Sequence, residues 1–256
     1  MRPNGTILWR GASLIDAKPI VAIAVGLTSK SSNRKTGAML QTYILRSDLD
    51  PMRAIKQGKD TSICGACPHR GAAGNGKGRT CYVNVGQGSL AVYRAFKRKR
   101  YPQAQSAQDL GANRFVRLGT YGDPAAVPAS IWQALVAAAA GHTGYTHLWR
   151  LRPELKRLCM ASVDSPAEAI EAQLIGWRTF RVGMKGNAAL ENMRGTEVLC
   201  PASIEAGHKL KCEACLACGG ADGRRSNIFI PGHGGFAVMS NIRKLAGIPI
   251  VHTGVN

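Results

Sequence analysis

Apolar and polar positions alternate in short runs over the first fifth of the chain. Residues 6–11, 19–27 and 38–47 are rich in β-branched residues and are bounded by Gly, Asn, Ser and Lys, which predicts three strands. The polar, basic stretch at 28–37, between the last two runs, predicts an exposed loop.

The pattern changes after residue 113, where runs with strand character alternate with helical periodicity. Strands are predicted at 114–118, 144–149, 159–163, 177–182 and 197–201, and helices at 128–141, 152–158 and 165–176. The last helix has the clearest start, with Ser165 as N-cap, Pro166 as first residue and Glu168 as capping-box partner. The alternation indicates βαβ units and a parallel sheet. We expect an α/β fold with a parallel βα barrel-like core of partial TIM type.

Length and composition are those of a globular protein, with 256 residues and 45% hydrophobic positions. We expect one integrated domain, in which an amino-terminal β-rich segment and Cys-rich metal-binding loops surround the core. Its segments are 1–57 (β-rich), 58–102 (Cys-rich loop and basic helix), 103–199 (βα-repeat core) and 200–256 (Cys-rich metal segment). No apolar run is long enough to span a membrane, so we expect no membrane partner.

Seven of the eight cysteines fall in two clusters, which is the spacing of metal ligands rather than of a disulfide scaffold. In the carboxyl-terminal cluster the ligands are Cys200, Cys212, Cys215 and Cys218. Two-residue gaps let neighbouring thiolates converge on one ion, and four thiolates suit zinc or a fully ligated iron–sulfur cluster. His208 or His233 could replace one of these thiolates. Cys159 lies apart from both clusters and is expected in the core.

The amino-terminal cluster contains three cysteines, Cys64, Cys67 and Cys81, and supports two interpretations. Three thiolates on a 4Fe–4S cluster leave one iron open for a small molecule such as S-adenosylmethionine. Alternatively, His69 completes a structural zinc site with the three cysteines. The spacing differs from the CxxxCxxC pattern common in radical enzymes, so both cofactors, iron–sulfur and zinc, remain open.

Polar residues follow the predicted strands, where parallel α/β folds collect their active sites. Tyr121, Asp123 and Asp164 are the candidate catalytic residues of this set, which also contains Arg150, Ser165, Arg181 and Cys200. His142 and His147 flank a predicted strand, and we expect both to be structural.

The net charge of +19 is concentrated in the first 100 residues, which contain 18 Lys and Arg against 4 Asp and Glu. Such a field favours a polyanion, and DNA or RNA is the expected partner. A predicted helix at 89–102 carries the densest group of cations, namely Arg94, Lys97, Arg98, Lys99 and Arg100. We expect these five to face solvent and contact phosphates, while the aromatic residues between them face the core.

A series of motifs lies along nearly the whole chain, namely NRKTGAMLQTYIL, SICGACPHRG, TCYVNVG, RLGTYGDPAAVP, GYTHLW, MASVDS, GWRTFRV and CPASIEAG followed by CEACLAC. Together these motifs resemble a family of cysteine-rich bacteriophage and prophage proteins without an assigned activity. More distantly, TCYVNVG and TYGDPAAVP are similar to elements of phage proteins with a radical-S-adenosylmethionine-like barrel. The resemblance implies a phage origin and a protein that acts in the cytoplasm of an infected bacterial host.

Three functions compete on these grounds. The first is a nucleic-acid-modifying enzyme with a reactive iron–sulfur cluster at the amino-terminal cysteines and a second, closed metal site. The second is a non-catalytic, zinc-stapled nucleic-acid-binding protein. The third is a base-exchange transglycosylase-like DNA-modifying enzyme, a class that also combines a barrel with a cysteine-rich zinc site. Asp123 and Asp164 would then be the nucleophile and base.

Overall fold

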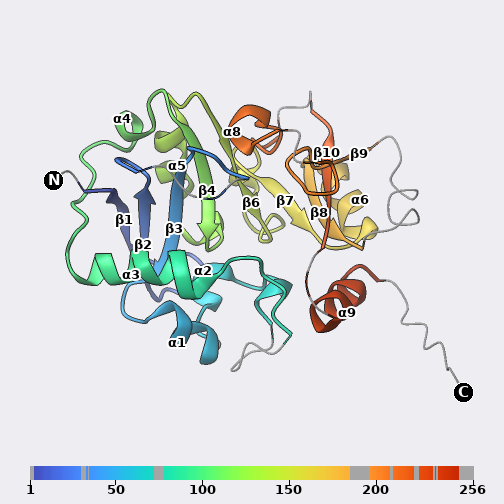
Figure 1. The fold of residues 1–256 in the computed structure, drawn as a ribbon, viewed down its shortest axis with the longest axis horizontal. Coiled ribbons are helices and arrows are strands. Elements are labelled where there is room, and N and C mark those ends of the chain that lie inside the picture. Colours follow the sequence, from blue (N-terminus) through green and yellow to red (C-terminus); the bar gives the residue numbers. More distant parts are fainter. Residues whose placement is uncertain are drawn as a thin grey trace, which may run out of the picture.

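The computed structural model describes residues 3–247, except 30–32, 34, 72–77, 185–195, 208–209, 222–224, 233 and 235. The candidate ligands His208 and His233 lie outside the described residues. The fold is mixed α/β with two five-stranded sheets (Figure 1).

The first sheet contains the amino-terminal strands in the order β1-β2-β3-β4-β5. Its strands are β1 (Gly5–Ala12), β2 (Pro19–Val25), β3 (Leu40–Arg46), β4 (Phe115–Tyr121) and β5 (Gly141–Thr143). The pairs β1–β2 and β2–β3 are antiparallel, whereas β3–β4 and β4–β5 are parallel. The three strands predicted in the amino-terminal segment are confirmed, and β5 was not predicted.

The second sheet is parallel throughout and has the order β6-β7-β8-β10-β9. Its strands are β6 (Tyr145–Thr146), β7 (Met160–Val163), β8 (Thr179–Gly183), β9 (Glu197–Leu199) and β10 (Asn227–Pro231). The predicted parallel sheet is therefore confirmed, with β10 as an unpredicted strand from the carboxyl-terminal segment.

Gly144 joins the two sheets, because it is the only residue between β5 and β6. A Cβ atom at this position would lie 2.8 Å from Cys159 Sγ and 2.9 Å from the Leu158 carbonyl oxygen, so only glycine fits without a shift. Through this short connection, the parallel strands β3, β4 and β5 of the first sheet are followed by the parallel strands of the second sheet, as far as β9 (Figure 1).

Helices flank the strands and connect them. They are α1 (Pro51–Lys56), α2 (Thr61–Cys64), α3 (Leu90–Lys97), α4 (Ala107–Gly111), α5 (Ala129–Val136), α6 (Pro166–Leu174), α8 (Cys212–Cys215) and α9 (Phe236–Leu245). Shorter turns are η1 (Pro68–Arg70), η2 (Val85–Ser89), η3 (Pro124–Ala126) and η4 (Pro153–Leu155), the last being all that forms of the helix predicted at 152–158. In the described part of the chain, no helix has the length and apolar character to cross a membrane.

Helix α6 begins where the sequence predicts, with Ser165 as its N-cap. Ser165 Oγ accepts a hydrogen bond from the Glu168 backbone N–H at 3.2 Å. The Glu168 carboxylate reaches back to the backbone N–H of Asp164, at 2.9 Å, one residue before the N-cap. This cap fixes the chain at the carboxyl end of β7, where Asp164 lies.

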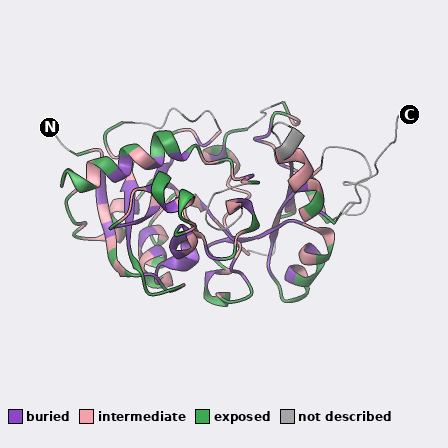
Figure 2. Cartoon of the chain, turned by 90° about the horizontal axis from the view of Figure 1, so that it is seen from below, coloured by how far each residue is buried: buried purple, intermediate pink, exposed green. Residues whose placement is uncertain are grey.

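Two apolar clusters form the core. The larger includes residues of β1–β4 and the buried Trp132, Trp149 and Trp177. The smaller packs Met39, Met160, Ile228 and Ile230 around three cysteines, Cys200, Cys212 and Cys218. Buried residues lie along the strands and exposed residues on the outer turns of the helices (Figure 2).

Candidate metal centre and cavity

One cavity of about 710 Å³ is lined by all seven clustered cysteines. The two cysteine clusters are far apart in sequence, yet they face the same space. Asp123 and His147, which follow β4 and β6, also line the cavity. The carboxyl ends of parallel strands therefore meet the cysteines there, as expected for an active site in a parallel α/β fold.

Tight turns hold the amino-terminal cysteines. Cys64 is the last residue of α2, and Cys67 precedes η1, with its N–H donating to the Cys64 carbonyl at 3.2 Å. The chain then returns so that the Cys81 N–H donates to the His69 carbonyl at 3.1 Å. Burial raises the pKa of the Cys64 and Cys81 thiols, and the neighbouring Cys67 raises both further. A bound cation would relieve this crowding of thiols, because it stabilises their ionised form.

Three of the carboxyl-terminal cysteines, Cys200, Cys212 and Cys218, pack with residues of β7, β8 and β10 in the second sheet. Cys200 follows β9 and donates its N–H to the Phe229 carbonyl at 2.8 Å, while Cys212 and Cys215 begin and end α8. Burial raises the pKa of Cys218 to about 12, and the thiols of the other three cysteines add to this, although a hydrogen bond with Tyr145 opposes it. Each of the other three thus lies close enough to influence the pKa of Cys218.

The spacing of the cysteine sulfurs can be compared with that of a closed zinc site. Across the described residues, three Cys sulfurs nowhere lie within 4.8 Å of one another. Tetrahedral zinc, with Zn–S bonds of about 2.3 Å, would hold sulfurs about 3.8 Å apart.

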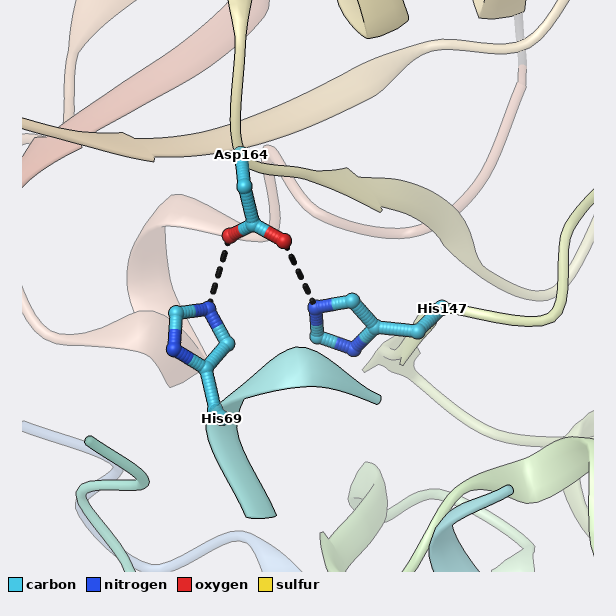
Figure 3. Close-up of side chains that lie close together, drawn as sticks. All are labelled: His69, His147 and Asp164. Atoms are coloured by element: carbon cyan, nitrogen blue, oxygen red, sulfur yellow. Dashed lines mark hydrogen bonds and ion pairs between the residues drawn. The ribbon is translucent and has the colours of Figure 1, made fainter. Parts of the chain in front are cut away.

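His69, His147 and Asp164 form the one group of three ligand atoms within 4.8 Å of one another that the described residues contain. His69 Nε2 lies 2.7 Å from Asp164 Oδ1, and His147 Nε2 lies 3.6 Å from Asp164 Oδ2. Figure 3 shows the carboxylate between the two imidazole rings. The residues come from η1, from the turn after β6 and from the turn after β7.

Both histidines have further partners. His69 Nδ1 lies 2.5 Å from Thr80 Oγ1, so both of its ring nitrogens face partners other than the cysteine thiols. His147 Nε2 also lies 3.9 Å from Cys67 Sγ. Burial lowers the pKa of His147, but Cys67 and Asp164 outweigh it and raise this pKa well above its usual value. Burial opposes ionisation of Asp164, yet the hydrogen bonds from His147 and His69 hold its pKa well below the usual range.

Asp123 links the ends of two strands. Its Oδ1 accepts from the Ala125 N–H at 2.9 Å, and its Oδ2 accepts from the His147 N–H at 2.8 Å. Burial raises the pKa of Asp123, although hydrogen bonds from Ala125, Thr146 and His147 oppose the change. With both oxygens occupied, the geometry favours a positioning role for Asp123 over a nucleophilic one.

Tyr121, the last residue of β4, is 1% exposed and lines the cavity. Its hydroxyl has no hydrogen-bond partner among the described residues, and neither do the cavity-lining hydroxyls of Ser89 and Thr143. Burial raises the pKa of Tyr121 well above its usual value, and the nearby Cys64 adds to this. Unpaired buried hydroxyls are costly, so these groups are ready to bind a ligand in the cavity.

The five basic-helix cations, Arg94, Lys97, Arg98, Lys99 and Arg100, are all exposed, whereas Tyr93 is buried. Helix α3 ends at Lys97 rather than before Pro102, because Lys99 adopts a left-handed conformation with φ 55°. The preceding turn, η2, contributes Gln87, Gly88 and Ser89 to the cavity lining. The amino-terminal end of α3 therefore lies beside the cavity, whereas four of the five cations lie at or beyond the other end of this helix.

Two strand-end arginines have structural partners instead. Arg181 lies within β8, not in a loop, and forms an ion pair with Glu197 at 2.7 Å, with both side chains 1% exposed. Arg150 forms an exposed ion pair with Glu171. The expectation that His147 is merely structural missed its contacts with Asp164 and Cys67.

No family model, curated protein or solved structure matches this chain.

Proposed function

We propose that this protein is a nucleic-acid-modifying metalloenzyme that uses an iron–sulfur cluster held by Cys64, Cys67 and Cys81. The observation that carries the proposal is the single cavity where these thiols, the second cysteine cluster and the ends of parallel strands meet. A merely structural metal would not need to face a space of about 710 Å³. Catalytic metal sites, by contrast, keep a position open to substrate.

Three features of the residues fit a cluster. No three cysteine sulfurs of the described residues all lie within 4.8 Å of one another, whereas tetrahedral zinc holds its sulfurs about 3.8 Å apart. His69, the alternative fourth ligand, has both ring nitrogens near Thr80 and Asp164. The unpaired hydroxyl of Tyr121, beside Cys64, supplies a donor to a sulfur or a bound cofactor, and such bonds tune cluster potentials.

The scaffold is a partial barrel in this proposal, formed by the parallel strands that continue from β3 across Gly144 to β9. A cluster at Cys64 and Cys67, in the connection after β3, would lie at the carboxyl ends of those strands. S-adenosylmethionine is the cofactor such a cluster would serve, since three protein ligands leave one iron open. The four carboxyl-terminal cysteines would hold a second metal or cluster.

Nucleic acid is the proposed substrate because α3, which leads to the basic-helix cations, begins beside the cavity. Arg94 lies four residues beyond the start of α3, or about 6 Å along the helix axis. A polynucleotide held by the basic-helix cations would thus place a neighbouring nucleotide at the cavity. The resemblance to phage proteins supports the same proposal and places the reaction in the cytoplasm of an infected host.

The test is reductive cleavage of S-adenosylmethionine by protein purified without oxygen and reduced with dithionite. We expect methionine and 5′-deoxyadenosine from the unchanged chain, and none from Cys81→Ala. Cys159→Ala is the matched control, because Cys159 is a buried core cysteine outside both clusters, and it should retain cleavage. An iron-loaded protein that cleaves no cofactor would contradict the enzymatic proposal.

A further inference from the structure

We infer that His69, His147 and Asp164 bind a mononuclear divalent transition metal in the wall of the cavity. Two imidazole nitrogens and one carboxylate oxygen are the ligands of many catalytic zinc and non-haem iron sites. The inference extends the proposed function, because it adds a third metal site to the two at the cysteine clusters, but it rests on geometry that requires no cluster.

The spacing of the three ligand atoms suits such an ion. Metal–ligand bonds of about 2.1 Å place tetrahedral ligand atoms about 3.4 Å apart. The observed separations from the Asp164 oxygens are 2.7 Å to His69 Nε2 and 3.6 Å to His147 Nε2, one below this value and one above it. Small side-chain rotations would bring all three atoms onto one ion between the rings shown in Figure 3.

Outer hydrogen bonds already orient the ligands. Thr80 Oγ1 lies 2.5 Å from His69 Nδ1 and fixes the ring so that Nε2 faces Asp164. Asp123 accepts the backbone N–H of His147 at 2.8 Å and so holds the turn that carries this ligand. Metal-binding histidines usually have such a second partner, which sets their tautomer and orientation.

The metal would keep an open position toward the cavity. The side chains of His69, His147 and Asp164 are 10%, 19% and 6% exposed, and both histidines line the cavity. Three protein ligands and one free position are the pattern of catalytic rather than structural zinc. The ion would therefore face a substrate held in the same space as the proposed cluster.

The experiment measures zinc, iron and sulfide per chain in protein purified without oxygen, incubated with zinc and passed through a desalting column. We expect His147→Gln and Asp164→Asn each to hold about one zinc ion fewer than the unchanged chain, with iron and sulfide unaltered. His142→Gln is the matched control, since His142 lies in β5 and outside the group of three ligand residues, and it should lose no zinc.

A second measurement distinguishes the loss of a metal ligand from misfolding of the variant. Cobalt added in place of zinc should give a visible d–d absorption that His147→Gln reduces, while circular dichroism of the variant stays unchanged. Equal zinc content in all chains would overturn the inference. So would a joint loss of iron and zinc in His147→Gln, because His147 would then belong to the cysteine site. Absence of iron with a normal zinc difference would refute the proposed function alone.

Discussion

Asp123 offers a direct test of whether a strand-end carboxylate positions the site or performs chemistry. Its two oxygens accept the backbone N–H groups of Ala125 and His147 at 2.9 and 2.8 Å. Hydrogen bonds to a charged group contribute about 1.5–3 kcal/mol each, so Asp123→Ala removes about 3–6 kcal/mol of interaction. The change also removes a buried carboxylate whose pKa is raised by burial, and this offsets part of the loss. We expect a net destabilisation of about 3 kcal/mol.

Asp123→Asn keeps one acceptor oxygen but turns an NH₂ group toward the second N–H, so we expect about half that loss. The assay is urea unfolding followed by tryptophan fluorescence, with all chains at equal metal content. Asp109→Ala is the control, because Asp109 is exposed and should unfold at nearly the same urea concentration as the unchanged chain. If Asp123→Ala kept the free energy of unfolding of the unchanged chain but lost S-adenosylmethionine cleavage, the positioning role would be refuted.

Three further changes test other parts of the structure. Glu197→Ala leaves the buried guanidinium of Arg181 without its carboxylate and should cost about 3–5 kcal/mol in urea unfolding, whereas Glu171→Ala, at an exposed pair, should change little. Replacing all five basic-helix cations with Gln should weaken DNA binding. The slope of log affinity against log salt concentration should become shallower by about 0.9 for each phosphate contact that is lost. Arg114→Gln, at the amino end of β4, should change neither the affinity nor the slope. An unchanged slope would exclude the basic helix from the interface. Tyr121→Phe should leave stability equal or higher, because the hydroxyl is unpaired, but should reduce cofactor cleavage; normal cleavage would remove Tyr121 from the site.

Local sequence signals predicted much of the fold. The apolar runs that form β1, β2 and β3 contain enough β-branched residues to predict strands. Ser165 and Pro166 predicted the start of α6. Strand β5 has only three residues, Gly141–Thr143, which is too short for a period-two pattern. Strand β10 was missed because it leads directly into the Gly-rich stretch at 232–235, a composition typical of turns rather than strands.

The candidate site was predictable only in part. Cysteine spacing singled out the candidate ligands within each cluster, but spacing carries no information on two clusters facing one cavity. His69 and Asp164 are 95 residues apart, and only the folded chain brings their atoms to 2.7 Å. His147 was assigned a structural role because an isolated histidine beside a strand has no local signal for its distant partners.

Iron and acid-labile sulfide content, with an absorption spectrum, tests the central claim most directly. The proposed cluster predicts a brown protein with absorption near roughly 400 nm when the chain is purified without oxygen. Cys81→Ala should lose the iron, the sulfide and the absorption, while Cys159→Ala should keep all three. A colourless protein that contains zinc but neither iron nor sulfide would contradict the claim and make the amino-terminal cysteines a structural zinc site.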